Sequence, residues 1–463
     1  MDSAPDYARQ KAADFIAQLN ELLTIPSIST LAEHAPDVER AARWLVDDMR
    51  RIGLRAEIHR ADGYLPLVYG EWLGAGADAP TVLVYGHYDV QPADIADGWG
   101  TPPFQPTQRD GRIYARGALD SKGHVIAHLK AVESLLATGD ALCNIKLLFE
   151  GEEESGSAHI YQFVRDNRQR LQADVIVVSD GSMPDEKQPV LVYGLRGIIQ
   201  FEMTVTGPAR DLHSGHYGGN VHNPLQALTE IMAALHDERG RVTVPGFYDA
   251  VRPITAQERD VLDGMREWSE REWHAVTGAP ATWGEPDYAL HERSGARPTL
   301  EINGMAGGFF EKGFKTVIPH KAWAKFSCRL VPDQQPATIA GQVIDYIHAL
   351  TPPTVRVEVT SDWRDAAPGV VLDYESPSMQ ACIRAYEQGW GVRPILTREG
   401  GSVPVVAVFA EVLDGDVVLM PFGYKGGGAH STNEYIVIEM FHKGIQTALA
   451  FYDQFAALHS GAD

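Results

Sequence analysis

The chain has 463 residues, of which 44% are hydrophobic and 22% charged, a composition typical of a folded globular protein. Its 62 acidic residues outnumber 40 Lys and Arg residues, and the net charge of −22 disfavours binding to nucleic acids and anionic membranes. The length exceeds one ordinary core and predicts two structural units.

The three cysteines, Cys143, Cys328 and Cys382, are odd in number and widely spaced. This pattern argues against a disulfide framework or a zinc finger and indicates a reducing compartment. No apolar stretch approaches the ~20 residues of a membrane span. Residues 1–23 lack the basic and apolar regions of a signal peptide. We therefore expect a cytoplasmic protein without membrane contacts.

The first part of the chain alternates between helical and strand patterns. Helices are predicted at residues 9–24, 37–53 and about 122–137. The predicted buried strands are Thr81–Tyr85, Ile145–Phe149 and Asp174–Ser179. Strands separated by helices predict an α/β fold with a mostly parallel sheet covered by helices.

The pattern changes near residue 195 and changes back near residue 364. Residues 198–205 alternate between apolar and polar, as in a sheet with one wet face. The other elements predicted in this stretch are helices at 223–236, 255–275 and 337–350 and strands at 321–330 and 354–360. After it we expect helices at 377–389, 404–412 and 437–458 and strands at 394–397 and 416–420. The sequence therefore predicts a catalytic domain, 1–195 plus 364–463, and an inserted α+β domain, 196–363.

Several familiar catalytic motifs are absent, including G-x-S-x-G, the P-loop and H-E-x-x-H. Five segments instead carry His or acidic residues, and most follow a predicted strand, where open α/β sheets bind ligands. The five segments are Gly86–Val90, Arg116–Gly123, Glu150–Ser157, Ser179–Gly181 and Gly426–Ser431.

Each segment alone has an ordinary interpretation. His87 and Asp89 suit a surface turn, and Asp120 suits a helix N-cap. Four acids within residues 150–154 suit a solvated loop, but at the end of a buried strand they require a cation. Together the loops offer His, Asp, Glu, Asp and His, a mixed set suited to zinc or manganese. Five ligands suffice for two ions that share one carboxylate.

A longer series of motifs runs through the chain in order. The motifs occupy residues 86–92, 153–157, 193–197, 211–215, 315–319, 329–333, 398–402 and 428–431. With them the chain resembles the co-catalytic zinc peptidase family of aminoacylase, glutamate carboxypeptidase, succinyl-diaminopimelate desuccinylase and the carnosinases. It looks closest to the branch of cytosolic nonspecific dipeptidase and carnosinase.

The resemblance implies a metal ligand set. Asp120 would bridge two divalent ions, Zn²⁺ or Mn²⁺, with His87 and Asp180 on one ion and Glu154 and His430 on the other. A cis peptide bond is expected after Asp120, although Ser121 replaces the residue that often follows in the family. The stretch 361–371 does not match the dipeptidase branch clearly, which leaves part of the substrate selectivity open.

The resemblance also implies roles in catalysis and substrate binding. Asp89 would hold His87, and Glu153 would be the general base. The residues that match substrate-binding positions are His213, Thr316, Arg329 and Ser402. The inserted domain would form a lid and a homodimer, in which His213 reaches into the partner's site. From residue type alone, His213 is a turn histidine and Arg329 a partner in a surface ion pair.

These roles predict metal-dependent hydrolysis of amide bonds in small peptides, most simply a dipeptidase. A water between two ions has a lowered pKa, and Glu153 would take its proton and pass it to the leaving amine. His213 would stabilise the oxyanion, and Arg329 would grip a C-terminal carboxylate. One alternative is an amidohydrolase for N-acyl or N-carbamoyl amino acids. A metal-binding scaffold without catalysis is disfavoured because Glu153 is not needed to hold metal.

Overall fold

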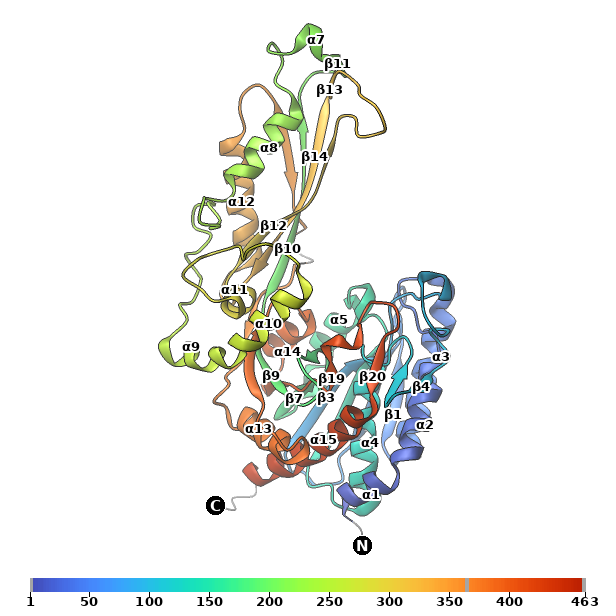
Figure 1. The fold of residues 1–463 in the computed structure, drawn as a ribbon. Helices are drawn as coiled ribbons and strands as arrows, with labels where there is room; N and C mark the ends of the chain where they lie inside the picture. Colours follow the sequence, from blue (N-terminus) through green and yellow to red (C-terminus); the bar gives the residue numbers. More distant parts are fainter. Residues whose placement is uncertain (1–2, 363–365, 460–463) are drawn as a thin grey trace. The chain divides into compact units, whose positions relative to one another are not determined.

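The structure is a computed structural model that describes residues 3–362 and 366–459, and these residues form two compact units. The first unit comprises the chain up to Tyr193, residues Leu372–Leu396 and the chain from Val408. The second comprises Gly194–Val371 and Thr397–Ala407 (Figure 1). Residues 397–407, which were predicted in the catalytic domain, thus group with the second unit. The predicted domain boundaries stay predictions, and the one at 363/364 falls outside the described residues.

The first unit is built on a sheet whose strands run in the order β1-β2-β6-β3-β7-β18-β9. The strands are β1 Arg55–His59, β2 Leu67–Trp72, β3 Thr81–His87, β6 Asn144–Glu150, β7 Val175–Val178, β9 Val190–Leu195 and β18 Asp416–Leu419. The central strands β6, β3, β7 and β18 are parallel, whereas β1, β2 and β9 pair antiparallel. The predicted α/β fold is therefore confirmed, and the antiparallel edges were not predicted.

Helices pack against this sheet. They are α1 Ala4–Gln10, α2 Ala12–Leu23, α3 Ala35–Arg51, α4 Lys122–Thr138, α5 Ala158–Asp166, α6 Arg168–Leu171, α13 Pro377–Gly389 and α15 Ile438–His459. Helix α3 contacts β1 and β2, α4 contacts β3, and α13 contacts β18. Because α4 also contacts α1, α2 and α15, nearly all of its side chains are buried, including polar ones such as Lys130 and Glu133.

Short strands complete the first unit and hold its loops. A three-stranded sheet joins β4 Thr107–Arg109, β5 Arg112–Tyr114 and β20 Tyr435–Val437. A two-stranded sheet joins β8 Ser182–Met183 to β19 Gly423–Tyr424. The elements β17 Ile395–Glu399 and α14 Pro404–Val412 contain residues of both units.

The second unit is an antiparallel sheet of order β12-β14-β10-β15. Its elements are β10 Gly197–Thr206, β11 Leu212–His213, α7 Ser214–Tyr217, α8 Pro224–Ala234, α9 Ala256–Leu262, α10 Arg266–Val276, α11 Leu290–Ala296, β12 Thr299–Gly307, β13 Val317–Ile318, β14 Lys321–Leu330, α12 Pro336–Leu350, β15 Arg356–Thr360 and β16 Val370–Val371. Alternate residues of β10 are buried, as predicted for a sheet with one wet face.

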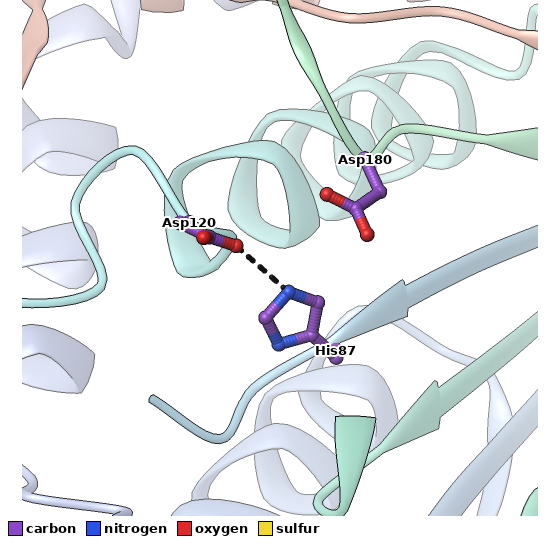
Figure 2. A group of neighbouring side chains, drawn as sticks. All are labelled: His87, Asp120 and Asp180. Carbon is purple, nitrogen blue, oxygen red and sulfur yellow. Dashed lines mark hydrogen bonds and ion pairs between the residues drawn. The ribbon is translucent and has the colours of Figure 1, made fainter. Parts of the chain in front are cut away.

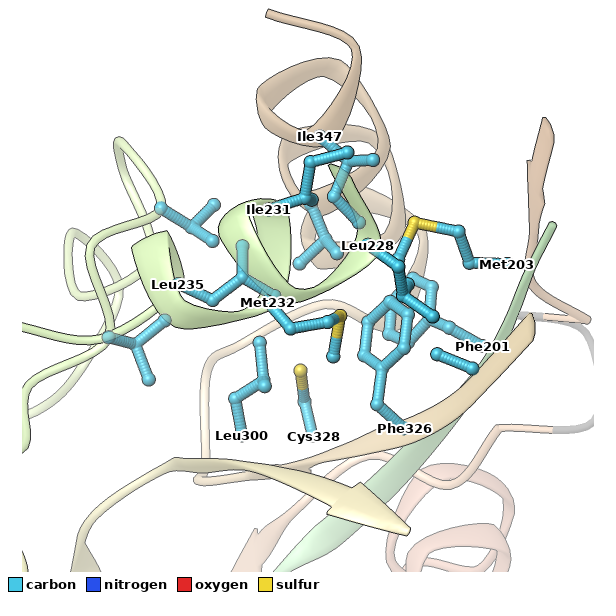
Figure 3. Close-up of a cluster of buried hydrophobic side chains, with 14 of the residues drawn as sticks. Phe201, Met203, Leu228, Ile231, Met232, Leu235, Leu300, Phe326, Cys328 and Ile347 are labelled. Carbon is cyan, nitrogen blue, oxygen red and sulfur yellow. The ribbon is translucent and has the colours of Figure 1, made fainter. Parts of the chain in front are cut away.

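The core of the second unit lies between this sheet and helices α8 and α12 (Figure 3). Phe201 and Phe326 stack with their ring centroids 4.8 Å apart, and Leu228 and Ile347 approach from the two helices. Helix α8 begins after Asn223, whose side chain accepts the Leu225 N–H, so the helix start is fixed by a side-chain cap. In the described chain, no helix is both long and apolar enough to span a bilayer.

Candidate active site

The parallel strands bring three of the predicted segments to one edge of the sheet. Strand β3 ends at His87, β6 ends at Glu150, and β7 ends at Val178, immediately before the segment Ser179–Gly181. Because β6, β3 and β7 are parallel neighbours, their carboxyl ends meet at the same edge. The loops that follow these strands therefore share one location.

The first candidate metal group consists of His87, Asp120 and Asp180 (Figure 2). One potential ligand atom of each residue lies within 4.8 Å of those of the other two. The His87 Nε2 atom lies 3.0 Å from Asp120 Oδ1, and the His87 side chain is fully buried. A nitrogen and two carboxylates at this spacing can surround one divalent cation.

The second candidate group consists of Asp120, Glu154 and His430, again within 4.8 Å. The His430 Nε2 atom lies 3.0 Å from Asp120 Oδ2 and 3.2 Å from Glu154 Oε1. The other Glu154 oxygen accepts a hydrogen bond from Gln91 Nε2 at 2.7 Å. Asp120 therefore belongs to both groups and turns a different carboxylate oxygen toward each, which is the arrangement that a bridging ligand needs.

The segment around Asp120 is not a simple helix cap. The N-cap of α4 is Ser121, and no side-chain hydrogen bond caps this helix. The N-cap interpretation of Asp120 is therefore wrong, because its carboxylate faces the two histidines instead. The peptide bond between Asp120 and Ser121 is cis, as the family resemblance implied.

Asp89 connects the His87 segment to the glutamate segment. Its carboxylate is fully buried and accepts the backbone N–H groups of Glu153 at 3.2 Å and Glu154 at 3.0 Å. The His87 Nδ1 atom lies 3.1 Å from the Asp89 carbonyl oxygen and 3.4 Å from its carboxylate. Contacts on Nδ1 leave Nε2 to face the metal groups, so Asp89 orients the imidazole.

Burial and neighbouring carboxylates raise the pKa values of two acids in this site, Glu153 and Asp180. Burial raises the pKa of Glu153 to about 9, with further contributions from Asp180 and Glu150. Burial raises the pKa of Asp180 to about 6, and Asp120 and Glu154 add to this shift. Acids in such surroundings hold protons or need a neighbouring cation.

The pKa values of the two histidines are raised as well, which favours their charged form. Hydrogen bonds to Asp120 and Glu154 raise the pKa of His430 to about 10. Burial opposes the charge on His87, but hydrogen bonds to Asp120 and Asp89 still raise its pKa well above the usual value. Protonated imidazoles thus balance the carboxylates, and divalent cations can take over that role as the imidazoles lose their protons. The mixed nitrogen and oxygen donors fit zinc or manganese.

Two predicted substrate-binding residues, His213 and Thr316, lie together in the second unit. His213 pairs with Val317 across β11 and β13, and the Thr316 carbonyl accepts the Ser214 N–H at 3.1 Å. Both side chains are exposed. The His213 Nδ1 atom accepts the Gly215 N–H at 3.0 Å, so this histidine also caps a turn.

The other two, Arg329 and Ser402, form a second pair in the same unit. Arg329 Nη1 donates to Ser402 Oγ at 3.1 Å, and Ser402 Oγ donates to the Arg196 carbonyl at 2.5 Å. Burial lowers the pKa of the half-buried Arg329 guanidinium. Among the described residues, the Arg329 side chain contacts a hydroxyl rather than the acid expected from residue type alone.

Two residues that the sequence did not single out also border the metal groups. Glu434 follows His430 by four residues, is fully buried, and accepts the backbone N–H groups of Leu119 and Asp120. Arg116 donates to Glu434 at 2.7 Å. The sequence signal that could have pointed to Glu434 is an acid directly before the short strand β20. This signal is weak because acids are common in loops.

Comparison with known protein families shows to which family the chain belongs. The model of "Peptidase family M20/M25/M40" matches residues 83–454, which include every member of the two metal groups. The chain belongs to this family. The Cys-Gly metallodipeptidase of Schizosaccharomyces pombe is 33% identical over 99% of both chains. The Beta-Ala-His dipeptidase of Homo sapiens is 32% identical over 96% of this chain and 91% of that protein.

Solved structures agree with this membership. The M20 family metallo-carboxypeptidase Sso-CP2 from Sulfolobus solfataricus is 30% identical over 96% of this chain and 99% of that chain, with a TM-score of 0.84. A hydantoinase/carbamoylase family amidase from Burkholderia multivorans is 14% identical, over 96% of this chain and 97% of that chain, with a TM-score of 0.59. The latter likeness shows a shared fold alone.

Proposed function

We propose that this M20 family member is a metal-dependent dipeptidase. The observation that carries the proposal is the double orientation of Asp120, whose two oxygens face His87 and His430 in two separate donor groups. The relatives that cover almost the whole chain support the substrate class, since their names specify dipeptides. The substrate is accordingly a small peptide with an amide bond to cleave.

The two donor groups would each hold one divalent ion, zinc or manganese. We assign His87 and Asp180 to one ion, Glu154 and His430 to the other, and Asp120 to both. When bound, such ions supply Lewis acidity, which makes water more acidic and a carbonyl more electrophilic. Asp89 orients His87 through Nδ1 and would thereby set the direction of the Nε2 lone pair.

Glu153 is the proposed general base. Its backbone is held by Asp89 next to the ligand Glu154, and its side chain lies among carboxylates that raise its proton affinity. Glu153 would take a proton from the attacking water and deliver it to the leaving amine nitrogen. Bound cations would lower the pKa of Glu153 and bring it closer to neutral pH.

Residues of the second unit would recognise the substrate. Arg329 carries a guanidinium that can pair with a C-terminal carboxylate through two parallel hydrogen bonds, and Ser402 fixes one of its nitrogens. His213 would donate a hydrogen bond to the oxyanion that develops at the scissile carbonyl, and Thr316 would line the same approach. These roles follow the family pattern at matching positions.

We further propose a homodimer joined through the second unit, with His213 completing the partner's site. The sheet of this unit exposes large apolar side chains on β12 and β14: Ile302 is 44% exposed, Met305 42% and Trp323 45%. Exposed apolar side chains of this size on the sheet support a protein interface there. The three cysteines are buried and free, which supports a cytoplasmic location.

A substrate panel tests this function against the amidohydrolase alternative. Metal-loaded protein should hydrolyse unmodified dipeptides far faster than N-acyl or N-carbamoyl amino acids with the same C-terminal residue. The Glu153→Gln variant serves as the matched control for contaminating peptidases. Faster hydrolysis of the acylated substrates would instead identify the protein as an amidohydrolase for N-acyl or N-carbamoyl amino acids.

A further inference from the structure

Glu434 is a fully buried carboxylate beside the metal groups that belongs to neither of them. It lies four residues after His430 and directly before β20. Because Glu434 is so close to His430 in the chain, the contacts of its side chain connect the His430 segment to the residues that it binds.

Among the described residues, the side chain of Glu434 binds a single segment, the residues that lead to Asp120. Its four acceptor contacts are Oε2 with Arg116 Nη1 at 2.7 Å and the Gly117 N–H at 2.9 Å, and Oε1 with the Leu119 N–H at 2.8 Å and the Asp120 N–H at 3.0 Å. The backbone carbonyl of Glu434 accepts the Ala115 N–H at 3.0 Å. Both ends of the residue thus hold the segment 115–120.

Arg116 extends these contacts to a third segment. Its guanidinium is buried, stacks over the Trp99 ring at 5.3 Å, and places Nη2 3.5 Å from the Pro92 carbonyl. Pro92 lies five residues after His87, in the loop that follows β3. The Arg116–Glu434 ion pair therefore joins the segments that carry His87, Asp120 and His430.

We propose that Glu434 is a positioning residue that sets metal affinity by fixing the backbone of Asp120. The Asp120 N–H is bound at 3.0 Å, and this anchor defines where the Asp120 Cα lies relative to both histidines. An Asp120 that shifts cannot keep one oxygen toward His87 and the other toward His430, so both ions lose a ligand together. The proposal rests on the metal centre of the proposed function, but not on the dipeptide substrate.

A buried ion pair can also act only on stability, and the chain offers a matched control. Lys130 and Asp48 form a buried pair of similar length, 2.5 Å, in the same unit. This pair joins α3 to α4 and also contacts Arg51 and Glu133, and within the described part of the chain it contacts none of the proposed ligands. A purely structural effect of Glu434 should be reproduced by Asp48→Asn, whereas a positioning effect should not.

Cobalt(II) provides a readout that does not depend on hydrolysis. Metal-free wild type, Glu434→Gln and Asp48→Asn are titrated with cobalt(II), while visible absorption and the bound metal per chain are measured. The glutamine keeps one acceptor oxygen, so it cannot accept both from Arg116 and Gly117 on one side and from Leu119 and Asp120 on the other. Loss of a partner outside the ligand set weakens metal binding by about 10- to 100-fold, and we expect this for Glu434→Gln with a changed spectrum. Asp48→Asn should match wild type.

A folded Glu434→Gln protein with wild-type cobalt affinity and spectrum would overturn the proposal, as would an equal loss in Asp48→Asn. Where Glu434→Gln does not fold, Glu434→Asp decides, since it keeps the negative charge but its shorter side chain cannot hold both Arg116 and the Asp120 N–H. Weaker cobalt binding in this variant supports the proposal, and unchanged binding overturns it. A wild type that binds two cobalt ions yet cleaves no dipeptide would reject the proposed function alone.

Discussion

Asp89 accepts the backbone N–H of Glu154 at 3.0 Å, from a position where its own backbone carbonyl and carboxylate both lie near His87. One buried carboxylate thus fixes a proposed ligand of each metal group. It also fixes the backbone of Glu153, the residue before Glu154. Asp89 thus holds the backbone of two adjacent glutamates that have different proposed roles. Mutation of each glutamate can distinguish these roles.

The first prediction separates the base from the ligand. Glu153→Gln should lower kcat by about 10²- to 10⁴-fold, the usual contribution of a general base, while metal content stays near two ions per chain. Glu154→Gln should lose activity and also metal, because it changes a ligand. Metal analysis after gel filtration measures the difference. Loss of metal in Glu153→Gln, with retention in Glu154→Gln, would mean that the two roles are exchanged.

The second prediction concerns recognition of the substrate's C-terminus. Arg329→Ala should weaken kcat/KM far more for a free dipeptide than for the same dipeptide with an amidated end, because only the former carries a carboxylate. Ser402→Ala is the matched variant, since it removes one hydrogen bond to Arg329 and keeps the charge. Its effect should be in the same direction and smaller. Equal losses on both substrates would assign Arg329 another role.

The third prediction concerns pH and the buried Glu150. Burial raises the pKa of this carboxyl to about 8 from an ordinary value of 4.5, although Tyr85 donates a hydrogen bond to it. The folded protein then keeps a proton that the unfolded chain releases, so this group's contribution to stability falls as the pH rises from 4.5 to 8.

Glu150→Gln mimics the protonated carboxyl and removes that loss. In metal-free protein, the unfolding free energy of Glu150→Gln minus that of wild type should rise between pH 4.5 and 8 and then level off. Denaturant titrations at several pH values measure the difference. A difference that stays constant over this range would show that Glu150 is ionised in the folded protein.

The fourth prediction tests whether the partner chain completes each site. His213→Ala and Glu153→Ala should each be inactive alone. In a mixed dimer one site regains both groups, because the Glu153→Ala chain supplies His213 to a site that keeps its own Glu153. With random pairing, half the dimers are mixed and each has one intact site, so co-expression should recover about a quarter of wild-type activity. Verified mixed dimers without activity would place His213 in its own chain's site or in none.

The meeting of three proposed ligand segments at one sheet edge could be predicted from the sequence, because each of these segments is tied to a strong local signal. His87, Glu154 and Asp180 follow buried strands, and parallel strands must end at one edge, so their meeting could be expected. The family pattern then selected Glu154 among several neighbouring acids. The separate interpretation of Asp120 as a helix cap failed because local pattern carries no information about two distant histidines.

Other parts could not be read from the sequence for identifiable reasons. Strand β1 has charged and half-exposed residues, and β12 is exposed along most of its length, so neither shows the apolar pattern that marks a strand. The contacts of Glu434 run to a segment more than 300 residues earlier in the chain. Pairs that distant depend on the whole fold and leave no local signature.

Removal and return of metal tests the central claim most directly. The protein is stripped with a chelator, its metal content is measured, and hydrolysis of one unmodified dipeptide is followed as zinc or manganese is added back. The account predicts no hydrolysis without metal, and restored hydrolysis that saturates at two ions per chain. Full activity in protein shown to contain no metal would contradict it.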